Sequence, residues 1–172
     1  MRINQKMGRW IAGAVIVICA ALVAGCGDDS YMQPTMTRAE AEARIEKLIH
    51  DAFAQLPPGA TLTPRSNGPV PCEDIFRGLY GKETLGIRYK IEYPDDWPVD
   101  EVIPRLVEYW KQQGTTVHRD DRDHPDPAYF VKYDDGFGIG VKEWRDGSTR
   151  NIQLVGTSPC IWPNGTPDQD HP

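Results

Sequence analysis

The sequence is poor in basic residues and in cysteines, and its apolar runs are shorter than the roughly 20 residues that a membrane-spanning helix needs. Its 172 residues include 19 Lys and Arg against 25 Asp and Glu, so the formal net charge is −6. This balance excludes a nucleic-acid-binding protein, because phosphate recognition needs clustered basic residues. The length suits one domain, and the 16 Gly and 15 Pro predict short elements joined by many turns.

Signatures of catalysis and metal binding are also scarce. Ser158 lacks the Gly-x-Ser-x-Gly context of a hydrolase nucleophile, and we identify no set of acid, base and nucleophile. We therefore expect no enzymatic activity and no catalytic residues. The acidic segment 118–126 lacks the glycine and the oxygen spacing of a calcium loop, so we interpret it as a solvated loop that binds no metal. The glycines of segment 136–140 lie within an expected strand, whereas a dinucleotide-binding loop joins a strand to a helix.

What the sequence does contain is an export signal at its beginning. Arg2, Lys6 and Arg9 form a positively charged segment, and an uncharged apolar run follows from Ile11 to Val23. This pattern is typical of a secretory signal peptide. The run is shorter than the roughly 20 residues that a membrane-spanning helix needs, so a single-span anchor is the weaker alternative.

The apolar run ends in Leu22-Val23-Ala24-Gly25-Cys26, which resembles the bacterial lipobox. The resemblance implies that residues 1–25 are removed as a lipoprotein signal peptide, and that Cys26 carries diacylglycerol and a fatty acid. Two or three acyl chains hold a protein stably at a membrane, so we expect a lipid anchor on the extracytoplasmic face of the cell membrane. Apart from these covalent groups we expect no cofactor. Cleavage would remove basic residues only, so we expect lipid rather than a basic patch to provide membrane binding.

Two of the four cysteines remain available for pairing. Cys19 lies within the signal peptide and Cys26 is the lipidation site, which leaves Cys72 and Cys160. Outside the cytoplasm we expect these two to form a disulfide, which closes a long loop and stabilises the fold by about 4–5 kcal/mol in the chain-entropy model. A redox or nucleophilic cysteine is the alternative, but the sequence has no Cys-x-x-Cys pair.

For the rest of the chain we expect a flexible tether over 26–36, a single α+β domain over 37–162 and a disordered tail over 163–172. Thr37 and Glu40 match a capping box, and apolar residues then recur at three- and four-residue spacing until Pro57-Pro58-Gly59. This pattern predicts the first helix. A second helix is expected from about Asp100 to Gly114, with an irregular first turn because Pro104 lies inside it.

Alternating apolar and polar residues predict the strands, and Asp-Gly pairs mark their turns. The segment 61–82 around Cys72 has only a weak strand signal. The clearer strands are expected over 87–93, 115–118, 128–133, 137–144 and 151–155. The predicted fold is α+β, an antiparallel sheet of about five or six strands with two helices packed on one face and one disulfide.

One candidate ligand face emerges from this pattern. Gly138 and Gly140 would leave a shallow trough on the sheet face that also carries Phe130 and Trp144. An apolar or sugar ligand could lie in this trough. The alternative is ordinary packing, with Trp144 lying over the glycines.

The whole pattern resembles the actinobacterial, mycobacterial-type envelope lipoproteins of the LppA-like group. The shared features are the lipobox, the amphipathic first helix, a cysteine after the loop Ser66–Pro71, the second helix, paired hairpins and a last cysteine after the final strand. They cover most of residues 10–163. The resemblance implies an envelope location and a disulfide-linked fold, and it implies no active site.

The expected function is a non-catalytic binding or structural role in the cell envelope. The partner would be an envelope protein, a lipid or a glycan. The alternative is a carrier of a small ligand or lipid that uses a pocket between helices and sheet. An apolar cavity of several hundred Å³ there would favour the carrier, and a filled core would favour the binding protein.

Overall fold

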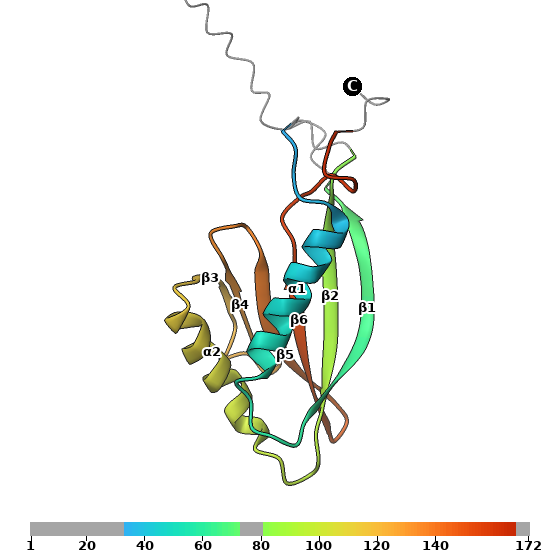
Figure 1. Ribbon diagram of the computed structural model, residues 1–172. Coiled ribbons are helices and arrows are strands. Elements are labelled where there is room, and N and C mark those ends of the chain that lie inside the picture. Colours follow the sequence, from blue (N-terminus) through green and yellow to red (C-terminus); the bar gives the residue numbers. More distant parts are fainter. Residues whose placement is uncertain (1–32, 73–80, 168–172) are drawn as a thin grey trace, which may run out of the picture.

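The computed structural model describes residues 33–72 and 81–167 (Figure 1). Its elements are α1 (Arg38–Phe53), β1 (Thr61–Pro71), β2 (Glu83–Glu92), the short 3-10 helix η3 (Val99–Glu101), α2 (Val102–Gln112), β3 (Thr116–Asp120), β4 (Ala128–Lys132), β5 (Gly138–Asp146) and β6 (Thr149–Thr157). The strands form one six-stranded antiparallel sheet in the order β1-β2-β6-β5-β4-β3, with helices on one face. The expected α+β fold is confirmed. The proposed signal peptide and Cys26 lie outside the described residues.

Helix α1 begins where the capping box predicts. The Glu40 carboxylate accepts a hydrogen bond from the Thr37 backbone N–H at 2.7 Å, and the Thr37 hydroxyl accepts one from the Glu40 N–H at 3.3 Å. The buried side of the helix consists of Ala41, Ile45, Leu48, Ile49 and Ala52. These residues lie against the sheet, and α1 runs along β2 and β6 (Figure 1).

Gly156 on β6 is the point of closest approach between α1 and the sheet. A Cβ atom at Gly156 would lie 2.4 Å from Cγ2 of Ile45 and 3.3 Å from Cδ1 of Ile49. Any larger residue would therefore push the helix away. Gly156 pairs with Ile87 on β2 and Ile139 on β5, so this contact lies at the centre of the sheet.

Helix α2 covers the β4 side of the same sheet face. Pro104 lies in its first turn, where a backbone N–H has no acceptor within the helix, so the proline is tolerated. The preceding turn, η3, is a 3-10 helix, which agrees with the expected irregular start. The Trp110 ring of α2 is fully buried and stacks on Tyr129 of β4 with centroids 6.2 Å apart.

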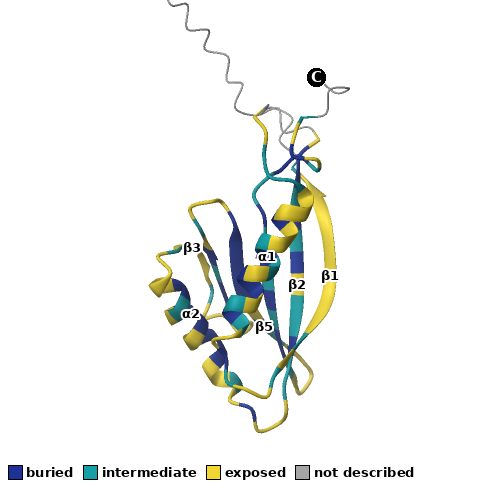
Figure 2. Ribbon diagram, in the orientation of Figure 1, coloured by how far each residue is buried: buried dark blue, intermediate teal, exposed yellow. Residues whose placement is uncertain are grey.

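The space between helices and sheet is filled by side chains. Figure 2 shows buried residues along the central strands and on the inner side of both helices. The largest fully buried side chains are Trp110, Tyr129, Phe137, Ile45, Ile49 and Ile91. These residues belong to one hydrophobic cluster, so a single core holds both helices on the sheet.

Strand β1 is longer and more regular than its weak sequence signal suggests. It has 11 residues and pairs with β2, with a register shift between Pro64 and Asn67. Pro64, Pro69 and Pro71 are tolerated because β1 is an edge strand, where some backbone N–H groups need no partner. Figure 2 shows that β1 is exposed along nearly its whole length.

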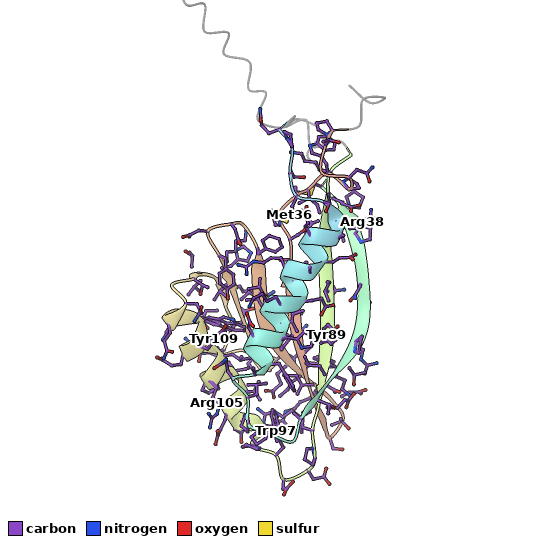
Figure 3. The ribbon with its side chains drawn as sticks, viewed as in Figure 1. Met36, Arg38, Tyr89, Trp97, Arg105 and Tyr109 are labelled. Atoms are coloured by element: carbon purple, nitrogen blue, oxygen red, sulfur yellow. A yellow bond between two sulfur atoms is a disulfide. The ribbon has the colours of Figure 1, made fainter. Side chains whose placement is uncertain are left out.

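The two ends of the described chain meet beside the disulfide. Cys72 and Cys160 are joined by an S–S bond of 2.08 Å, as expected. The Thr35 N–H donates to the Gly165 carbonyl at 2.9 Å, and Met36 packs on the core (Figure 3). The packed unit therefore extends on both sides of the expected limits 37–162. We call this part of the molecule, with Thr35, Cys72, Cys160 and Gly165, the disulfide end.

Ion pairs fasten both ends of the helical layer to the sheet. At the disulfide end, Nη2 of Arg38 donates to Glu83 of β2 at 2.7 Å (Figure 3). At the far end, Arg150 of β6 pairs with Glu143, which is only 4% exposed, and with Asp100 of η3. The hydrogen bonds that Arg150 donates to Glu143 raise the pKa of Arg150 above its usual value, so the buried carboxylate keeps a charged partner.

The contact at Gly156 leads to a stability prediction. Gly156→Ala should lower the free energy of unfolding by about 1–3 kcal/mol, because the methyl group overlaps Ile45. Gly86→Ala on the neighbouring strand is the matched control, since a Cβ there has no atom within 4 Å. Urea denaturation followed by circular dichroism measures both. Equal effects of the two substitutions would contradict this account of the helix-sheet contact.

The disulfide leads to a second stability prediction. Replacing Cys72 and Cys160 together by serine should lower the free energy of unfolding by about 4–5 kcal/mol, because the bond closes a loop with a sequence separation of 88. Urea denaturation of the oxidised protein and of the double variant measures the difference. Reduction of the unmodified protein should reproduce the loss, and a loss below about 1 kcal/mol in both would show that the bond adds little to stability.

Candidate functional site

The candidate site lies on the sheet face that points away from the helices. Successive strand residues point to opposite faces, and the helices cover the face of Ile87, Ile139 and Leu154 (Figure 1). The opposite side, which we call the open face, is formed by Thr84, Gly86, Arg88, Lys90, Glu92, Ala128, Phe130, Lys132, Gly138, Gly140, Lys142, Trp144, Asp146, Asn151, Gln153, Val155 and Thr157.

A hollow of about 700 Å³ lies on the open face near the disulfide end. We call it the open-face hollow. Gly138, Val155 and Thr157 are among the residues at its base, and Phe130 lines one side. The basic residues His118, Arg119 and Lys132 also line it, and Pro159 and Cys160 line the end next to the disulfide. Its volume is within the range of ligand-binding pockets.

Phe130 fills part of the trough that the glycines were expected to leave. Phe130 pairs directly with Gly140, and a Cβ atom at Gly140 would lie 2.2 Å from the Phe130 ring. The ring therefore lies across Gly140. At Gly138 a Cβ atom would lie 2.7 Å from the Thr157 hydroxyl oxygen, so the missing side chain leaves room for Thr157.

Trp144 does not lie where the trough hypothesis placed it. It lies on the open face but pairs with Asn151 toward the far end of β5, and it is not among the residues that line the hollow. The structure thus brings Phe130 and Gly138 together at the hollow and covers Gly140 with Phe130. The aromatic ring that packs on Gly140 is that of Phe130, whereas the sequence suggested Trp144.

The disulfide end of the hollow is held by side-chain hydroxyls. The Thr84 hydroxyl oxygen lies 3.2 Å from Sγ of Cys72 and 3.6 Å from Sγ of Cys160. The Ser158 hydroxyl accepts from the Leu85 N–H at 2.9 Å and donates to the Pro159 carbonyl at 2.7 Å. Ser158 therefore connects the segment after β6 to strand β2.

The open face carries mostly positive charge at and beside the hollow. Arg88 pairs in register with Val155, which lines the hollow, and Lys132 pairs with Gly138. Arg119 forms an ion pair with Asp121. Among the described residues Lys132 has no ion pair. The carboxylates of the open face, Glu92 and Asp146, come last on their strands, at the end far from the disulfide.

In the acidic segment 118–126, the two arginines pair with two of the four aspartates. Arg122 donates to both carboxylate oxygens of Asp120 at 2.7 Å, and this hydrogen bonding lowers the pKa of Asp120. Arg119 pairs with Asp121. Within residues 33–72 and 81–167 there is no group of three or more His, Cys, Asp and Glu that could hold a metal ion.

Two further findings concern the chain as a whole. The helices within the described ranges are too short or too polar to cross a membrane. Comparisons with protein-family models, curated proteins and solved structures found no match to this chain.

The contact between Phe130 and Gly140 leads to a prediction for a double-mutant cycle. Gly140→Ala should lower the free energy of unfolding by about 1–3 kcal/mol, because the added methyl group displaces the Phe130 ring. In a Phe130→Leu background the same change should cost less, since the ring is gone. Thermal and urea denaturation of the four proteins measure the coupling. Additive losses would show that the ring does not lie over Gly140.

Proposed function

We propose that this chain is a lipid-anchored protein of the extracytoplasmic side of the cell membrane, with a non-catalytic binding role. The observation that carries the proposal is the sequence Leu22-Val23-Ala24-Gly25-Cys26, which resembles a lipobox and follows a charged and then an apolar segment. The disulfide between Cys72 and Cys160 supports it, because such bonds persist in oxidising compartments and are rare in the cytosol.

The filled core favours a binding protein over a carrier. Trp110, Tyr129 and Phe137 are fully buried between the helices and the sheet. A carrier would need room there for its ligand, whereas the hollow of about 700 Å³ lies on the open face. The carrier alternative therefore has less support. We propose that the open face is the binding surface of this protein.

The position of the N-terminal end would place the disulfide end next to the membrane. The segment between Cys26 and Thr35 spans at most about 30 Å when fully extended. Thr35 is held at the disulfide end by its hydrogen bond with Gly165. A lipid on Cys26 would thus keep this end, and the open-face hollow beside it, close to the headgroups.

Acylation of Cys26 can be tested directly by mass spectrometry. In a bacterium that processes lipoproteins, the mature protein should begin at Cys26 and carry the mass of diacylglycerol and a fatty acid. Cys26→Ser should prevent acylation and cleavage. Cys19→Ser is the matched control, because this residue lies inside the apolar run and its replacement should leave the mature product unchanged.

The same experiment can also contradict the proposal. Recovery of a full-length, unacylated protein with reduced Cys72 and Cys160 would overturn the proposal. Fractionation gives a second readout, since the acylated protein should sediment with membranes and need detergent for release.

A further inference from the structure

We propose that the open-face hollow and the basic residues around it bind the headgroup of an acidic phospholipid in the membrane that holds the anchor. This inference rests on the proposed function, because the anchor supplies the closeness to the membrane. It assigns a ligand class to the binding surface and adds a second contact with the membrane besides the lipid chains.

The lining of the hollow offers both apolar surface and positive charge, which complement the apolar and the negatively charged parts of an acidic phospholipid. Phe130 and Val155 offer apolar surface, while Lys132 and Arg119 offer cationic donors. Phosphate oxygens accept strong hydrogen bonds from charged donors of this kind. The Thr157 hydroxyl lines the hollow as well and forms no hydrogen bond with any other described residue, so it is available to a ligand.

The charged side chains on this half of the open face, Arg88 and Lys132, are basic, and Lys132 has no ion pair with the described residues. Lys132 pairs in register with Gly138 and is exposed. Arg88 is exposed beside Val155, and within the described part of the chain it donates to the Ser66 hydroxyl. The open-face carboxylates Glu92 and Asp146 are at the other end of their strands. A negative group in the hollow would therefore meet cations first.

The net negative charge of the chain does not prevent this contact. At 0.1 M salt the Debye length is about 10 Å, so a surface interacts mainly with the charges nearest to it. The acidic residues of α1, such as Glu42 and Glu46, lie on the helical side of the sheet. A bilayer that approaches the open face at the disulfide end is screened from them.

Vesicle binding by an anchor-free chain tests the proposal. All helices, strands and core residues and the disulfide of the described structure lie within residues 35–167, so a chain starting at Gly27 keeps the whole packed unit. We expect the oxidised chain to co-sediment with vesicles of phosphatidylcholine and phosphatidylglycerol at 0.1 M salt, and not with phosphatidylcholine alone.

Two matched substitutions locate the binding on the open face. Lys132→Gln should weaken binding to the phosphatidylglycerol vesicles about fivefold, because each basic residue near an anionic surface contributes about that much. Lys111→Gln removes the same charge from the exposed side of α2 and should leave binding unchanged. Circular dichroism spectra of both variants should match the parent chain.

Three results would overturn the inference. The first is equal binding to both kinds of vesicle or none to either, and the second is an equal loss from Lys132→Gln and Lys111→Gln. The third is inhibition by soluble polyglutamate at charge concentrations equal to those of the lipid, which would show that the face binds any polyanion. Acylation of Cys26 is read separately from the mass of the full-length product, so this inference and the proposed function can fail independently.

Discussion

The packing of helix α1 on Gly156 is the constraint on which the rest of the structure depends. Because the glycine has no side chain, Ile45 and Ile49 reach the centre of the sheet, and the core then closes over the strands with Trp110 and Phe137 fully buried. In this arrangement the helices cover one face of the sheet, and the side chains of that face form the hydrophobic core. The opposite face carries charged residues such as Arg88 and Lys132 that are exposed to solvent, which is why we propose it as the binding surface.

The features that the sequence predicted are those determined by neighbouring residues. The capping box of Thr37 and Glu40 begins α1, and the alternation along β5 places Ile139 and Val141 in the core as expected. Pairing between distant strands is set by contacts that no local pattern contains. Strand β1 was only a weak prediction because three prolines and Gly68 reduce its strand signal, although its edge position makes them harmless.

The candidate site shows the same division between local and long-range information. The glycines of β5 indicated a gap on one sheet face, but only the register of β4 on β5 places Phe130 over Gly140. The basic character of the open face also depends on register, since Arg88, Lys132 and Lys142 come from different strands. A net charge of −6 describes the chain as a whole and conceals a face of the opposite sign.

The disulfide end takes part in both roles that we propose for this protein, attachment through Cys26 and ligand binding in the open-face hollow. A pull from an anchor at Cys26 would reach the fold at Thr35, whose hydroxyl accepts from the Trp162 N–H at 2.8 Å and whose N–H donates to Gly165. The segment that would receive this load is joined to Cys72 by Cys160. Pro159 and Cys160 of the same segment line the open-face hollow, so the disulfide that would resist such a pull also holds that part of the hollow in place. A covalent bond serves this purpose better than hydrogen bonds at an exposed end, because local opening frees hydrogen bonds at small cost.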